Sequence, residues 1–77
     1  MVIDIEEFEN EFEENYKMLY QNDCGIKGYY GKINKYNRLT KRSDVKELLK
    51  RFIIHRGDFI SSDRECVAFV LTLEKYM

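Results

Sequence analysis

A stripe of apolar residues at helical spacing runs from Ile5 to Leu19. Its members are three, four, four and three residues apart, which places them on one face of an α-helix: Ile5, Phe8, Phe12, Tyr16 and Leu19. Asp4 and Glu7 have the three-residue spacing of a capping box, the reciprocal pair of hydrogen bonds that starts many helices. The sequence therefore predicts an amphipathic helix over 4–20, against which the rest of the chain must pack.

The outer side of this predicted helix is strongly acidic. Six glutamates surround the apolar stripe: Glu6, Glu7, Glu9, Glu11, Glu13 and Glu14. Like charges four residues apart destabilise a helix by roughly 0.2–0.5 kcal/mol per pair, so this clustering has a cost. Two interpretations stay open. The glutamates form a solvated face that keeps the protein soluble, or they dock on the basic surface of a larger protein that handles nucleic acid.

Charge is segregated along the chain, although the net charge is only −1. Residues 1–23 carry a net charge of −7, residues 24–57 a net charge of +8, and residues 58–77 a net charge of −2. Opposite charges attract, so we expect the acidic helix to lie near the basic middle segment in the folded protein.

The basic segment 26–39 is ambiguous in secondary structure. A helical stripe is present in it, formed by Ile26, Tyr29, Ile33, Tyr36 and Leu39. Gly28 and Gly31 each oppose a helix by about 1 kcal/mol. The tyrosines and isoleucines equally suit a short hairpin with the glycines at turns or bulges. We expect an irregular or β-hairpin connection here, and helix remains the alternative.

A second helix is predicted after Ser43. Asp44 and Glu47 repeat the capping-box spacing, and Gly57 is placed to end the helix as a left-handed cap. The apolar side chains of this segment fall on one face, with one of them at its edge: Val45, Leu48, Leu49, Phe52 and Ile53. Ile54 points outward among charged residues.

The last element starts at Ser62, which forms a third capping-box pair with Glu65. One helical face carries Cys66, Phe69, Val70, Leu73 and Met77, and further apolar residues lie off that face. We therefore predict a central helix that is buried on more than one side. A strand is the alternative, because apolar residues also alternate between Val67 and Leu73.

These elements predict a mainly α fold. We expect a single small globular domain over 1–77, a three-helix bundle with an irregular or short β-hairpin connection between the first two helices. A 77-residue chain buries only about 60% of its unfolded surface, so its stability is marginal. Association into a homo-oligomer is one way to add stability.

No catalytic, cofactor or metal motif is present in the sequence. His55 has no nucleophile placed beside it by any motif. Cys24, Cys66 and His55 lack the ligand spacing of a zinc site, and Arg56-Gly57-Asp58 at a helix end is a chance match to the integrin tripeptide. We predict a protein without enzymatic activity, metal or cofactor.

The N-terminus lacks the pattern of a signal peptide, and no apolar run approaches the roughly 20 residues of a membrane span. We therefore expect a cytoplasmic protein with reduced thiols and no membrane association. The composition has one Ala, no Pro and no Trp, and it is rich in Lys, Ile, Asn, Tyr and Phe. This bias suits an A+T-rich genome, as in a phage or a mobile element.

Two functions follow from the charge pattern. The preferred one is a protein-interaction module, in the concrete form of an inhibitor that docks its acidic helix on a nucleic-acid-handling protein. The alternative is a small protein that binds single-stranded nucleic acid. Such a surface needs cations interleaved with stacking aromatics, and the basic segment 27–42 supplies Lys27, Tyr29, Tyr30, Lys32, Lys35, Tyr36 and Arg38.

Overall fold

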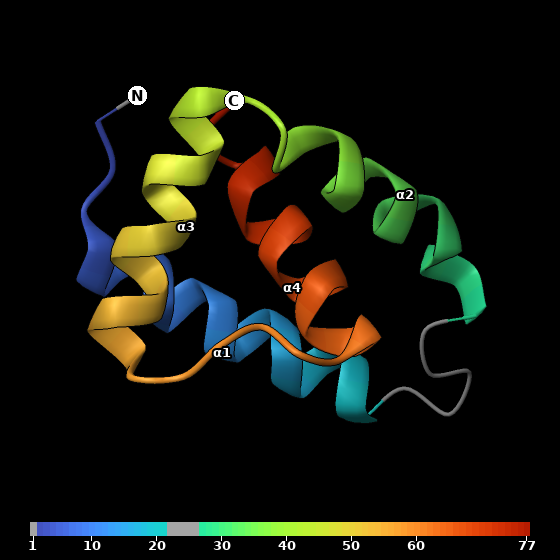
Figure 1. The fold of residues 1–77 in the computed structure, drawn as a ribbon. Coiled ribbons are helices and arrows are strands. Elements are labelled where there is room, and N and C mark those ends of the chain that lie inside the picture. The colour runs from blue at the N-terminus through green and yellow to red at the C-terminus, as the bar shows by residue number, and fades with distance from the viewer. Residues whose placement is uncertain (1, 22–26) are drawn as a thin grey trace.

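The computed structural model describes residues 2–21 and 27–77 and is mainly helical (Figure 1). Its elements are α1 (Ile5–Gln21), the short 3-10 helix η1 (Lys27–Tyr29), α2 (Tyr30–Leu39), α3 (Ser43–Arg56) and α4 (Asp63–Glu74). These described ranges contain no β-strand. The prediction of a mainly α chain is confirmed. The described residues form four α-helices rather than the expected three.

Helix α4 lies at the centre of the fold. It packs against α1 on one side and against α2 on the other, and α3 packs against α1 (Figure 1). Its buried apolar residues lie on several faces: Val67, Ala68, Phe69, Val70 and Leu73. The prediction of a central helix buried on more than one side is confirmed. The strand alternative is wrong, since Asp63–Glu74 is a helix. The alternation of apolar residues arises because a helix covered on several sides also carries apolar residues at every second position.

The predicted β-hairpin between the first two helices is wrong. Residues 30–39 form helix α2, and Ile33, Tyr36 and Leu39 pack on the hydrophobic core. The burial of these side chains outweighs the low helix propensity of Gly31. Gly28 and Gly31 are exposed, with no atom near the position of a Cβ, so neither marks a turn or a close approach. Ile26, the first member of the predicted stripe, lies outside the described residues.

The capping signals had different outcomes. Asp4 caps α1, since its Oδ1 accepts the backbone N–H of Glu6 at 3.0 Å and that of Glu7 at 3.2 Å. Ser62 and Glu65 form the predicted capping box of α4. Gly57 has φ 75° and donates its N–H to the carbonyl of Ile53 at 2.9 Å, as the cap prediction required.

The capping box predicted at Asp44 is wrong. Helix α3 begins at Ser43, two residues earlier than an Asp44 cap would place it, and Arg42 is its N-cap without a side-chain hydrogen bond. The carboxylate of Asp44 instead pairs with the Arg42 guanidinium at 2.9 Å. The pKa of Asp44 is lowered: desolvation would raise it, but the hydrogen bonds from Arg42 and from the backbone N–H of Val45, together with the charge of Arg42, outweigh that effect.

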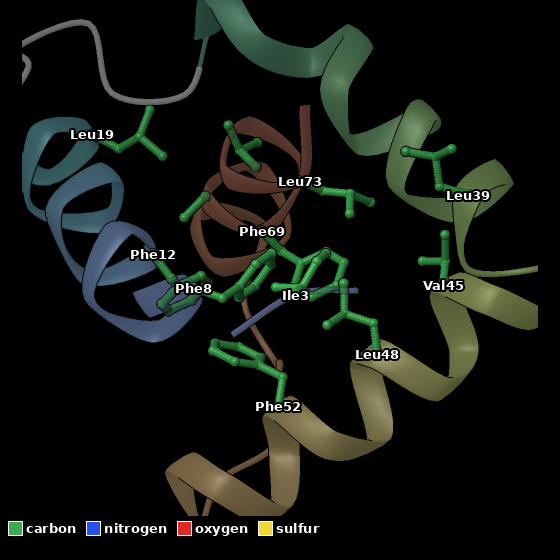
Figure 2. Close-up of a cluster of buried hydrophobic side chains, with 12 residues drawn as sticks. Ile3, Phe8, Phe12, Leu19, Leu39, Val45, Leu48, Phe52, Phe69 and Leu73 are labelled. Atoms are coloured by element: carbon green, nitrogen blue, oxygen red, sulfur yellow. The ribbon is translucent and has the colours of Figure 1, made fainter. Parts of the chain in front are cut away.

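Four phenylalanine rings form the middle of the core (Figure 2), those of Phe8, Phe12, Phe52 and Phe69, and Tyr36 packs against this group. The ring of Phe69 on α4 lies 5.4 Å from that of Phe8 on α1, 5.8 Å from that of Phe52 on α3, and 5.8 Å from that of Tyr36 on α2. Phe12 packs edge-on against Phe52 at 4.8 Å. Phe69 therefore contacts one ring from each of the other three α-helices.

A polar contact crosses the interface between α1 and α4. The side-chain amide of Asn15 donates to Thr72 Oγ1 at 2.8 Å, and the Thr72 hydroxyl donates to the carbonyl of Ala68 at 2.8 Å. Thr72 is fully buried, so its hydroxyl is satisfied within the protein, as a buried polar group requires.

A nearly buried ion pair joins the end of α3 to the start of α4. Arg56 Nη1 lies 2.8 Å from Glu65 Oε2, and the two side chains are only 13% and 10% exposed. The guanidinium also lies over the rings of Phe12, at 5.0 Å, and Phe52, at 5.5 Å. The sequence indicated only that Arg56 lies near the end of a predicted helix, and it did not predict the pairing with Glu65.

Stability should fall in acid because of Glu65. Desolvation alone would raise its pKa, but hydrogen bonds from Arg56, Ser61 and Ser62 lower it below the ordinary value of 4.5. A carboxylate with a lowered folded-state pKa stabilises the fold fully above its unfolded pKa, and this contribution is lost as the pH falls through the folded pKa.

We therefore expect the urea midpoint to decrease as the pH falls below about 4.5. The variant Glu65→Gln, which has no charge to lose, should show a flatter profile over the same range when unfolding is followed by circular dichroism. Parallel profiles for the two proteins would contradict this assignment.

Candidate functional site

The outer side of α1 carries four exposed glutamates, which we call the acidic face: Glu6, Glu7, Glu13 and Glu14. Residues seven apart on a helix point in nearly the same direction, so the four glutamates form two rows about 100° apart, with the exposed side chains of Asn10 and Lys17 between them. None of the four forms an ion pair or a side-chain hydrogen bond within 2–21 and 27–77. The acidic face is therefore a negative surface in which Lys17 is the one cation of α1, and no ion pair within the described residues neutralises its four glutamates.

The other two predicted partner-binding glutamates are used by the fold. The carboxylate of Glu9 pairs with Nδ1 of His55 on α3. Glu11 lies 3.9 Å from the ammonium of Lys75. Desolvation, followed by the neighbouring Glu11 carboxylate, raises the pKa of Tyr76 to about 12. The contact with His55 joins one edge of α1 to α3, and the contact with Lys75 joins its other edge to the end of α4.

The position of α4 explains why the acidic face stays uncompensated. We expected the acidic helix to lie near the basic middle segment. Helix α3 of that segment does pack on α1, whereas α2 lies on the far side of α4 (Figure 1). Within the described residues, the side-chain pair that joins 27–57 to α1 is that of His55 with Glu9. No Lys or Arg of this segment forms an ion pair with α1 in the same residues.

The residues of the nucleic-acid alternative are divided between the core and the surface. Lys32 and Lys35 both bind the carboxylate of Glu74, at 2.8 and 2.5 Å. Desolvation would raise the pKa of Glu74, and the hydrogen bonds from these two lysines hold it below its ordinary value. This pair of cations therefore fastens α2 to α4.

The aromatic members are divided in the same way. Tyr36 packs edge-on against Phe69, and burial raises the pKa of its hydroxyl. Tyr29 is half-buried against the core. Three of the seven predicted residues remain exposed on the outer side of the segment: Lys27, Tyr30 and Arg38.

One exposed aromatic beside the acidic face was not predicted from the sequence. Tyr20 near the end of α1 is 66% exposed, and the guanidinium of Arg64 lies 4.6 Å from its ring centre. The available signal in the sequence was that Tyr20 is not a member of the apolar stripe, which indicates an exposed ring. The Tyr20 ring thus adds an apolar, cation-accepting surface at the C-terminal end of α1.

No pocket is found in residues 2–21 and 27–77, and these residues contain no group of three or more His, Cys, Asp or Glu that could hold a metal ion. Cys66 is a free, half-buried thiol whose pKa is raised by burial, and Cys24 lies outside the described residues. Nor does any described helix have the length and apolar character needed to span a membrane.

Comparison with protein-family models, curated proteins and solved structures gave no match to this chain. Its function is therefore inferred from the surfaces described above.

Proposed function

We propose that this protein is a non-enzymatic interaction module that docks its acidic face on a basic surface of a larger protein. The uncompensated acidic face carries this proposal. The segment 24–57 contains ten Lys and Arg residues, yet the fold places α4 between α1 and α2 and leaves four adjacent carboxylates open to solvent. A basic partner would neutralise them on binding.

The partner class follows from the chemistry of the surface. The acidic face resembles a phosphate backbone in the sign of its charge, and proteins that bind nucleic acid neutralise phosphates with clustered Lys and Arg. A helix that occupies such a cluster competes with the nucleic acid, so the expected outcome is inhibition. The small size and A+T-rich composition suit a phage or mobile-element product that acts in the cytoplasm of a host.

The helix is also suited to fast docking. Asp4 fixes its start, and Phe8 and Phe12 fix its inner face in the core. The carboxylates are therefore presented by an ordered backbone, which reduces the entropy lost on binding. Complementary charge raises the association rate more than it raises the affinity of the final complex.

Reversing two charges of the acidic face should slow partner binding. In the test variant, Glu13→Lys and Glu14→Lys change two exposed side chains that make no described contact. The matched control, Glu47→Lys with Asp58→Lys, raises the net charge equally, from −1 to +3, but lies outside α1. With a partner captured by the unmodified protein and then purified, we expect the test variant to associate about tenfold more slowly or worse. The control should stay near the unmodified rate.

The measurement is the association rate at low and high salt, since screening weakens steering between exposed charges. The unmodified protein and the control should lose speed as salt increases, and the test variant should respond less. Equal slowing by the test and control variants would reduce the effect to net charge and would refute docking through the acidic face. Circular dichroism of all three proteins verifies that each is folded.

Binding of single-stranded nucleic acid is the second candidate. The observation in its favour is that Tyr30 and Arg38 on α2 and Lys27 in η1 just before it are all exposed, which combines cations with an aromatic ring. Replacing Lys27 and Arg38 with Gln should then abolish binding of a random oligonucleotide. If the unmodified protein binds no oligonucleotide at low salt, this candidate is excluded.

A further inference from the structure

We propose that the protein associates with itself head to tail, with the acidic face of one copy on the outer side of α2 in the next copy. This inference rests on the acidic face being a docking surface, as the proposed function does, but it names a second copy of the chain as the occupant. The contact is electrostatic and reversible, and it can form without any larger partner.

The outer side of α2 is complementary to the acidic face in charge. We call it the basic face and define it by the exposed side chains of Lys27, Tyr30, Asn34, Arg38 and Lys41. Tyr30, Asn34 and Arg38 are four residues apart and form one stripe of α2, while Lys27 lies in η1 just before this helix and Lys41 in the turn just after it. None of the three cations forms an ion pair within the described residues, and Tyr30 is 57% exposed.

The two faces of one molecule point away from each other. The central helix α4 packs against α1 on one side and against α2 on the other (Figure 1), and both faces lie on the sides opposite to α4. The acidic and basic faces therefore do not neutralise each other within one chain. Neutralisation has to come from another molecule, which leaves each face available for a second copy.

The net charge favours a second copy as that molecule. Two copies that each carry −1 repel each other only weakly as whole molecules, so the local attraction between opposite faces is not cancelled by long-range repulsion. A partner of strongly acidic or strongly basic overall charge would be attracted by one face and repelled by the other. A second copy, which is nearly neutral as a whole, can be attracted by either face.

The arrangement of the faces also determines the kind of assembly. A two-fold dimer pairs a surface with itself, and a face of one charge sign is not complementary to itself. Each contact must join two different surfaces, and these surfaces lie on opposite sides of the molecule. Such a contact leaves one acidic and one basic face free at the two ends, so further copies add to an open chain.

Assembly of this kind would regulate docking. The acidic face in each contact is covered by the next copy, so a larger basic partner must compete with the basic face of this protein. High salt or dilution would free the acidic face, because exposed charges attract each other less when they are screened. The same surface would then switch between a self-associated and a partner-bound state.

Sedimentation velocity of the purified protein tests this inference. At low salt, the weight-average sedimentation coefficient should increase with protein concentration without reaching the plateau of a dimer. At high salt it should stay at the monomer value. The acidic reversal (Glu13→Lys with Glu14→Lys) and a basic reversal (Arg38→Glu with Lys41→Glu) should each weaken association at low salt by about tenfold or more.

A combined variant carries all four reversals and serves as the matched control. Its net charge returns to −1, and the reversed residues of the two faces are again opposite in sign, so its self-association should recover relative to either half variant. Circular dichroism distinguishes loss of association from loss of folding.

Three results would overturn the inference: a monomer at every concentration in low salt, association unchanged by both reversals, or a folded combined variant no more associated than the halves. A monomeric protein whose acidic reversal still slows binding to a captured partner would leave the proposed function intact. Self-association abolished by the reversals, with a captured partner that binds the acidic reversal normally, would refute the proposed function instead.

Discussion

Replacing Phe69 with Ala should reduce the free energy of unfolding by about 3–5 kcal/mol, a cost typical of a fully buried Phe. Phe69 has no exposed surface, and its ring contacts Phe8, Tyr36 and Phe52 from the three other α-helices. Removing it opens a cavity at the point where all four helices meet. The total free energy of unfolding of a small domain is about 5–15 kcal/mol, so this single change should remove a large part of it.

Phe59→Ala is the matched control, because it deletes the same side chain from a position that is 71% exposed. Its effect should stay within about 0.5 kcal/mol. Urea unfolding followed by far-ultraviolet circular dichroism measures both. Similar midpoints for the two variants would show that α4 is not the centre of the core.

Removing either partner of the Arg56 and Glu65 ion pair should cost about 3 kcal/mol, because the remaining charge is left nearly buried and unpaired. Arg56→Ala also loses the stacking of the guanidinium on Phe12 and Phe52. Glu65→Ala also loses the capping box of α4. The pair Arg42 and Asp44 serves as a control, since its side chains are 51% and 37% exposed. Arg42→Ala should cost less than about 1 kcal/mol.

A double variant separates the ion pair from the packing around it. Arg56→Met combined with Glu65→Gln keeps the approximate volume of both side chains and leaves no unpaired charge. Its cost in urea unfolding should be smaller than the summed costs of the two single changes, because the residues are coupled. Additive costs would mean that the two side chains stabilise the fold independently.

The elements that the sequence predicted well are those in which local pattern and burial agree. The stripe of α1 was predicted, with Phe8, Phe12 and Leu19 fully or almost fully buried. Helix α2 was only the alternative prediction because Gly28 and Gly31 oppose a helix, whereas its packing on α4 favours one. Burial against another element is a tertiary effect, and a propensity scale does not include it.

Side-chain pairs that form only in the folded protein could not be predicted from the sequence either. The spacing of Asp44 and Glu47 matched a capping box, but Asp44 pairs with Arg42 instead. Arg56 and Glu65 meet because Gly57 adopts a positive φ and turns the chain. Among the six glutamates of α1, spacing alone did not separate those that contact His55 and Lys75 from those that stay open.

The contact between Asn15 and Thr72 determines the register of α1 along α4. Rows of Phe side chains four residues apart look alike after a shift of one helical turn, so apolar packing alone discriminates weakly between neighbouring alignments. A shift of one turn, about 5.4 Å, would separate the amide from the hydroxyl. It would also bring different glutamates opposite His55 and Lys75. One amide on the inner side of α1 thus helps to decide which carboxylates on its outer side remain free.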